Sequence, residues 1–140
     1  MKKIFLFVAH SLLISNLVFA QQKQHKIIFD FAKGDTASFA TIVRHANNIM
    51  TASPTAKVEV MCHGPGLDIL VKDKTTVQKE IAELHEKFNV VFAACEATMK
   101  RRGIDKNQLL PQAVTVPLAN LELSSKQQEG WSYIKSGYNP

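Results

Sequence analysis

The chain has 140 residues, with 17 Lys and Arg against 12 Asp and Glu, and a formal net charge of +5 at pH 7. The basic residues are scattered and form a run only at 100–102, so the charge gives no reason to expect nucleic-acid binding. Two cysteines are too few for a disulfide framework. The fold must therefore be stabilised by a buried apolar core.

Residues 1–20 have the order of a secretory signal peptide. Lys2 and Lys3 precede a mostly apolar stretch, Val18-Phe19-Ala20 resembles an A-x-A cleavage site, and polar residues follow at 21–24. The stretch is short and interrupted for a membrane span, although an uncleaved N-terminal anchor is an alternative. We expect an exported protein, periplasmic or secreted. Its mature chain, residues 21–140, should form one soluble domain without a membrane segment.

The first half of the chain alternates strand and helix. A short apolar strand over 26–31 precedes a helix that starts at Asp35 or Thr36 and ends at Ser53-Pro54. A second strand over 57–62 is stopped by His63-Gly64-Pro65-Gly66, and a helical turn is expected over 67–71. Thr75 and Gln78 have the spacing of a capping box, and the second helix that follows has this apolar stripe: Val77, Ile81, Leu84 and Phe88.

The second half continues the alternation. Residues 89–94 are apolar on both faces, as a central parallel strand requires, and a helix over 96–102 closed by Gly103 follows Cys95. A strand over 113–116 and a helix over about 118–129 follow. Residues 131–135 could be a fifth strand or more helix, and Gly130 and the β-prone residues favour the strand. The pattern predicts an α/β fold of three layers, α/β/α, with a mostly parallel sheet of four to five strands.

Cys95 is the first candidate for chemistry. It stands where a strand meets a helix, so unpaired N–H groups and the basic side chains of Lys100 and Arg101 should favour its thiolate, whereas Glu96 should oppose it. The alternative is that Cys95 is a small buried hydrophobe, as free cysteines often are.

Cys62 also ends a strand, so its relation to Cys95 stays open at this point. If the two strands are neighbours, they lie about 4.8 Å apart and the thiols could form a disulfide or a redox couple. If the first strand lies between them, the thiols are about 10 Å apart and cannot bond.

Three further residues follow the second strand. His63 could act as a base or could be a solvated turn residue. Gly64 and Gly66 could present backbone N–H groups to a small anion, or could only form a tight turn. Cys62, His63 and Cys95 lack the fourth ligand and the spacing of a zinc or copper site, so we expect no metal and no cofactor.

Residues 95–104, Cys-Glu-Ala-Thr-Met-Lys-Arg-Arg-Gly-Ile, resemble the cysteine segment of the DsrE/DsrF-like proteins, in whose sulfur-relay members the active cysteine also precedes an Arg-Arg-Gly. Residues 60–66 and 127–134 resemble an exported or stand-alone branch of that family, and the resemblance runs from about 26 to 135. It implies a five-stranded parallel sheet, assembly into trimers or hexamers, and a persulfide on Cys95 that is passed to a partner protein.

The resulting hypothesis is a thiol-based sulfur carrier or sulfur-transfer protein with Cys95 as the persulfide-bearing nucleophile. The pocket-lining or supporting residues would be Cys62, His63, Gly64, Gly66, Glu96 and Arg101. One alternative is a non-enzymatic oligomeric binding module with an inert Cys95. Another is an exported redox or metal-handling protein that uses both cysteines.

Overall fold

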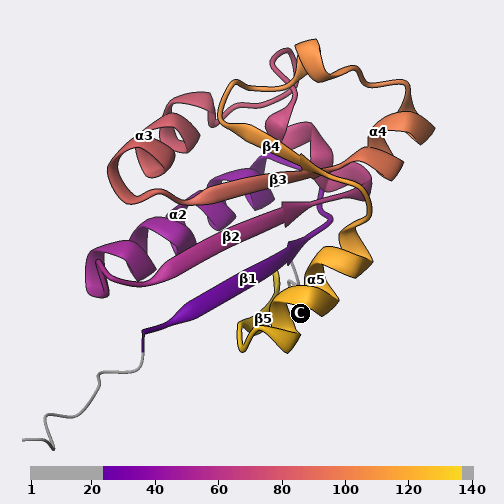
Figure 1. The fold of residues 1–140 in the computed structure, drawn as a ribbon. Helices are drawn as coiled ribbons and strands as arrows, with labels where there is room; N and C mark the ends of the chain where they lie inside the picture. The colour runs from indigo at the N-terminus through magenta and orange to yellow at the C-terminus, as the bar shows by residue number, and fades with distance from the viewer. Residues whose placement is uncertain (1–23, 137–140) are drawn as a thin grey trace, which may run out of the picture.

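The structure, a computed structural model, describes residues 24–136, so the expected signal peptide lies outside the described residues. Strands and helices alternate along them (Figure 1). The strands are β1 (Lys26–Phe31), β2 (Lys57–Cys62), β3 (Val91–Cys95), β4 (Ala113–Val116) and β5 (Ser132–Ser136). The helices are α2 (Thr36–Ala52), α3 (Gln78–Phe88), α4 (Glu96–Arg102) and α5 (Ala119–Gln128), with 3₁₀ turns η1 (Gly64–Leu70) and η2 (Lys106–Gln108).

The five strands form one parallel sheet in the order β4-β3-β2-β1-β5. Helices α2 and α3 cover one face, and α5 lies on the other (Figure 1). The predicted fold class is therefore confirmed, and so is the fifth strand, which pairs with β1 along the far edge. Parallel strands need crossover connections, and the helices between them supply these connections.

Local signals set most of the helix ends. Asp35 caps α2, because its carboxylate accepts the N–H of Ser38 at 2.8 Å. Gly103 ends α4 with a φ of +63°, which glycine adopts without steric cost. The predicted capping box at Thr75 is wrong, because α3 begins at Gln78 with Val77 at its N-cap. The Thr75 hydroxyl instead accepts the N–H of Val77, two residues on, in a turn that precedes the helix.

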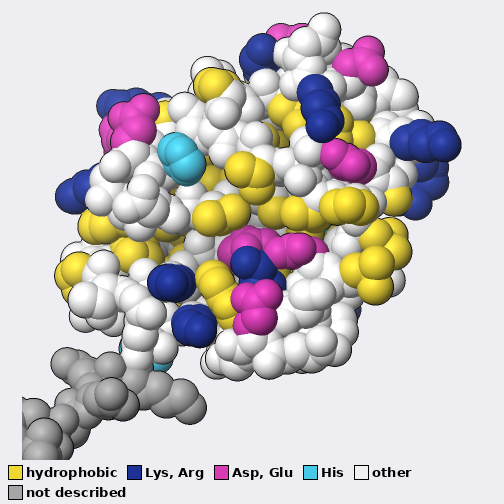
Figure 2. Space-filling model, in the orientation of Figure 1, with side chains coloured by type: hydrophobic (Ala, Val, Ile, Leu, Met, Phe, Trp, Pro, Cys, Tyr) yellow, Lys and Arg dark blue, Asp and Glu magenta, His cyan; other side chains and the backbone are white. Residues whose placement is uncertain are grey.

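The apolar core has two parts of unequal size, one on each face of the sheet. The larger part packs α2, α3 and η1 against one face, whereas the smaller part lies under α5 and consists of Ile28, Met61, Ala93, Cys95, Ala119 and Leu123. Helix α5 covers only part of its face, and Figure 2 shows hydrophobic side chains at the surface on this side. The exposed large hydrophobic residues are Val114, Leu118, Leu121, Tyr133 and Ile134.

Among residues 24–136, no helix has the length and apolar character that a bilayer crossing requires.

Candidate functional site

Cys95 lies at the carboxyl end of the central strands, where ligands bind in open parallel sheets. It is the last residue of β3 and the N-cap of α4, and it is 2% exposed. The start of α5 covers it, since Ala119 belongs to the same small core, and the Ala97 N–H donates to Pro117 O at 3.2 Å nearby. The thiol therefore lies at the junction of β3, α4 and α5.

The surroundings of Cys95 favour its thiolate. Burial alone would raise the pKa of this thiol, but the Thr98 hydroxyl and the N–H groups of Thr98, Ala119 and Ala97 lower it, and the net pKa is below the usual value. Cys95 makes no side-chain cap hydrogen bond at the start of α4, so these donors act on the pKa by lying close to the sulfur. Their combined effect outweighs that of the burial.

Thr98 connects the thiol to its surroundings. Its hydroxyl oxygen accepts the N–H of Gly64 at 3.2 Å and Arg101 Nη2 at 3.4 Å. A hydroxyl has two acceptor sites and one donor, so these contacts leave the O–H free to donate to the sulfur of Cys95. Arg101 thus acts on Cys95 through Thr98. Sequence reasoning missed Thr98, although its position three residues after an N-cap cysteine places it on the same helical turn.

Cys62 does not join this site. Strands β2 and β3 are neighbours, so the alternative in which β1 separates them is wrong, but Cys62 pairs with Ala94. Successive side chains point to opposite faces of a strand, and the two thiols therefore lie on opposite sides of the sheet. Both cysteines are free. Burial, with a contribution from the Glu59 charge, raises the pKa of Cys62 far above its usual range.

His63 takes part in a second polar network on the Cys95 side of the sheet. Its Nε2 lies 2.6 Å from Asp30 Oδ1, and the Tyr133 hydroxyl donates to Asp30 Oδ2, also at 2.6 Å. The hydrogen bond from His63 is the largest cause lowering the pKa of Asp30, and the bond to Asp30 raises the pKa of Tyr133 to about 12. Sequence reasoning missed both partners. A carboxylate within the apolar run Ile-Ile-Phe-Asp-Phe was the available signal for Asp30.

The glycine loop is held in place by side chains and close packing. Arg102 Nη1 donates to Gly64 O at 2.9 Å, and Arg102 Nη2 donates to both carboxylate oxygens of Asp68, at 2.8 and 2.9 Å. The second arginine of the Arg-Arg-Gly therefore connects α4 to η1. Gly64 has a φ of +52°. Gly66 packs against the backbone of Phe31, whose oxygen would lie 2.6 Å from an added Cβ. The structural reason for Gly66 is therefore a close approach of backbones.

Glu96 is bound away from the thiol. Its carboxylate lies 3.3 Å from Lys106 Nζ, and the Thr115 hydroxyl followed by Lys106 lowers the pKa of this carboxyl. Glu96 therefore interacts with β4 and η2.

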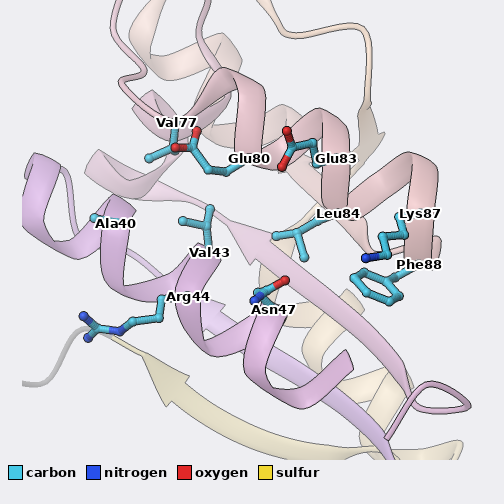
Figure 3. A pocket seen from close by; sticks show the side chains of 10 residues that line it. All are labelled: Ala40, Val43, Arg44, Asn47, Val77, Glu80, Glu83, Leu84, Lys87 and Phe88. Carbon is cyan, nitrogen blue, oxygen red and sulfur yellow. The ribbon is translucent and has the colours of Figure 1, made fainter. Parts of the chain in front are cut away.

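A separate groove of about 450 Å³ lies between α2 and α3, on the opposite side of the sheet from Cys95 (Figure 3). Val43 and Leu84 point into it, and Glu80 and Arg44 stand at its rims. No cysteine lines this groove, so we place the candidate site at Cys95. No group of three or more His, Cys, Asp or Glu side chains within residues 24–136 is arranged to hold a metal ion.

The fold and the site together define the class: an α/β protein with a parallel sheet and a thiol at the carboxyl end of one of its central strands. The chain belongs to the DsrE/DsrF-like family, whose model matches residues 23–136. Membership of this family suggests a function of the sulfur-relay type. None of the curated protein sequences matches the chain.

Three solved structures share the fold. The protein of unknown function MTH1491 from Methanobacterium thermoautotrophicum is 24% identical with a TM-score of 0.75, over 80% of this chain and 99% of that one. The YchN protein of E. coli is 14% identical with a TM-score of 0.65, over 80% and 98%. BT1422 from Bacteroides thetaiotaomicron, a conserved protein of unknown function, is 16% identical with a TM-score of 0.66, over 83% and 98%.

Proposed function

We propose that the protein is a thiol-based sulfur carrier and that Cys95 bears the transferred sulfur as a persulfide. The observation that best supports this proposal is the difference between the environments of the two thiols, Cys95 and Cys62. The pKa of Cys95 is lowered by hydrogen-bond donors, whereas burial raises the pKa of Cys62. The thiolate is the nucleophilic form, so only Cys95 is prepared to attack a sulfur donor.

The loading step can be written with a donor such as thiosulfate. The Cys95 thiolate attacks the outer sulfur, a Cys95 S–S bond forms, the S–S bond of thiosulfate breaks, and sulfite leaves with the bonding electron pair. The charge is minus three on both sides. Unloading reverses the roles: an acceptor thiolate attacks the outer sulfur of the persulfide and releases the Cys95 thiolate.

Access to the sulfur requires a small opening. Cys95 is 2% exposed, and the segment from Pro117 to Ala119 lies over it. This segment connects β4 to α5 and carries the exposed Leu118, so its movement would uncover the thiol without disturbing the sheet. The α5 face, with its exposed Leu118 and Leu121, is also where we propose that a donor, an acceptor or another copy of the chain binds.

The decisive test uses the native protein and its own second thiol as the reference. After exposure to thiosulfate or sulfide with a mild oxidant, peptide mass mapping should show a gain of about 32 Da, one sulfur atom, at Cys95 and none at Cys62. If neither thiol is modified in the folded protein and both are modified equally after unfolding, Cys95 is a packed and inert residue.

The role of Thr98 gives a second test. Replacing Thr98→Val removes the hydroxyl donor, and the alkylation rate of Cys95 at pH 7 should fall about tenfold because a hydrogen bond to a charged group contributes at least 1.4 kcal/mol. Thr98→Ser keeps the hydroxyl and is the matched control, which should react like the wild type. If Val and Ser behave alike, hydrogen bonding from Thr98 does not set the reactivity.

Export and self-assembly are also proposals. N-terminal analysis of protein recovered from its native cells would show whether the chain starts at Gln21, and its mass in solution would show whether it forms the trimers or hexamers that the family resemblance implies.

A further inference from the structure

Asp30, His63 and Tyr133 form a continuous polar network at the carboxyl edge of the sheet. They come from β1, from the residue after β2 and from β5, so the fold brings together positions far apart in the sequence. Both hydrogen bonds to Asp30 are 2.6 Å long, a length usual for the Tyr133 hydroxyl on an ionised acceptor and slightly short for the His63 nitrogen. The side chains of His63 and Asp30 are 26% and 14% exposed, so the network is shielded but reachable.

The network shares a face of the sheet with Cys95. Asp30 pairs with Met61, Met61 pairs with Ala93, and paired residues of parallel strands point to the same side. His63 follows Met61 by two positions and Cys95 follows Ala93 by two, so continuing the β2–β3 register one residue past the end of β2 sets the His63 backbone beside that of Cys95. The backbone continues in this register, since the His63 N–H donates to Phe31 O at 3.1 Å.

The residue after His63 is hydrogen-bonded to the helical turn that follows Cys95. Gly64, the next residue, donates its N–H to the Thr98 hydroxyl, and this hydroxyl is also the side chain that acts on the sulfur of Cys95. The loop that carries His63 and the helix turn after Cys95 are therefore joined through one hydroxyl group.

The bond to Asp30 fixes how His63 can react. Nε2 is engaged by the carboxylate, so Nδ1 is the ring nitrogen that can accept or donate a proton elsewhere. A carboxylate on one ring nitrogen orients the imidazole and sets its tautomer, as in other nucleophile–histidine–carboxylate arrangements. Tyr133 occupies the other oxygen of Asp30 and keeps the carboxylate from rotating.

We propose that this network handles the proton of the Cys95 site: His63 takes the proton of the Cys95 thiol and passes it to the leaving group, while Asp30 and Tyr133 are positioning residues. The proposal rests on the function proposed above. In the loading step the Cys95 S–H bond breaks, His63 becomes imidazolium, and the thiolate attacks thiosulfate. Sulfite leaves and takes the proton from His63 as bisulfite, so His63 is neutral again and the sum of charges is unchanged.

Other charged groups lie around the network. Lys135 on β5 pairs in register with Asp30 and acts on its charge, Arg102 of α4 binds the loop at Gly64 O, and Cys95 lies on the β3 side. Neither Lys135 nor Arg102 bonds to the His63 ring. Because replacing His63 also changes the pKa of Asp30, the Asp30→Asn variant is needed to assign a change in the pH profile to the imidazole.

The test measures the rate of persulfide formation on Cys95 with thiosulfate from pH 5 to 9. His63→Ala should lower the rate at neutral pH about 100-fold and should lose one limb of the pH profile. Added imidazole should restore part of the rate, because the half-buried His63 position can be reached from solvent. Asp30→Asn should change the profile in the same direction, and Tyr133→Phe should have a smaller effect. His45→Ala, at an exposed position on α2, is the matched control and should behave like the wild type.

The outcomes separate the two proposals. If the wild type forms persulfide but His63→Ala does so at the same rate and with the same pH profile, the proton-handling role is refuted and the sulfur-carrier proposal stands. A uniform loss at all pH values that imidazole does not restore also refutes it, since that is the behaviour of a structural residue. If the wild type forms no persulfide, both proposals fail.

Discussion

The ion pair between Glu59 and Lys126 joins a buried carboxylate of the sheet to the helix that covers it. Glu59 on β2 is 3% exposed, and its Oε2 lies 3.0 Å from Nζ of Lys126 on α5. The other oxygen, Oε1, is buried without a hydrogen-bond partner. Lys126 also lies 4.6 Å from the centre of the Trp131 ring. We therefore expect Lys126→Met to leave a buried and unpaired carboxylate.

The magnitude follows from the distance and the burial. At 3.0 Å and an effective dielectric constant of about 20, the attraction is about 5 kcal/mol. Removing one partner of a buried pair costs about 3–5 kcal/mol. We expect the lower end, about 3 kcal/mol, because Lys126 is 21% exposed and water can partly replace it. For a domain of this size the melting temperature should fall by about 12 °C.

The loss should depend on pH in a defined direction. Burial raises the pKa of Glu59 above its usual 4.5, more than Lys126 lowers it. The pKa of Lys126 is raised too, because attraction to Glu59 there outweighs its own burial. The pairing thus does not fully offset the burial of the carboxylate. A carboxyl whose folded pKa is raised favours folding fully below its unfolded pKa and loses this contribution as the pH rises through the folded value.

Lys126→Met raises the pKa of Glu59 further, so its destabilisation should be largest at pH 8 and should shrink as the pH falls to 5. Urea unfolding at both values measures this. The double variant Glu59→Gln with Lys126→Met should recover much of the stability, and Lys79→Met, which removes an exposed pair with Glu83, should change nothing measurable. A loss in Lys126→Met that is equal at pH 5 and pH 8 would refute the assignment to Glu59.

Two further predictions concern the loop at the candidate site. Gly66→Ala should lower the free energy of unfolding by about 1–3 kcal/mol, because the added Cβ would lie 2.6 Å from Phe31 O; urea unfolding without any loss of stability would show that the backbone shifts freely. Arg102→Lys should cost about 1–2 kcal/mol in the same assay, because arginine reaches Asp68 with Nη2 and Gly64 O with Nη1, whereas lysine has one nitrogen for both; full retention of stability would mean that these bonds are dispensable.

Local patterns predicted the elements well because the relevant interactions are short in sequence. The strand at 57–62, the helix ended by Gly103 and the strand at 113–116 follow from apolar runs and from residues that stop them. The start of α3 was mispredicted for a related reason: Thr75 and Gln78 fit a capping box, but the Thr75 hydroxyl bonds within a preceding turn instead. A separation of three positions between Thr75 and Gln78 does not distinguish these two uses of the Thr75 hydroxyl.

The amino-acid sequence by itself determined that strands and helices alternate and that Cys95 stands at the junction of a strand and a helix. It could not decide which strands are neighbours or which residues face each other across them, because pairing joins positions 21 to 105 residues apart by backbone hydrogen bonds that carry no side-chain signal. The register of β2 with β3, offset by one residue between the two cysteines, separated Cys62 from Cys95. The pairing of β1 with both β2 and β5 brought His63 and Tyr133 to Asp30. Only the tertiary structure made that decision, since side chains change faces of a sheet with every single step in register.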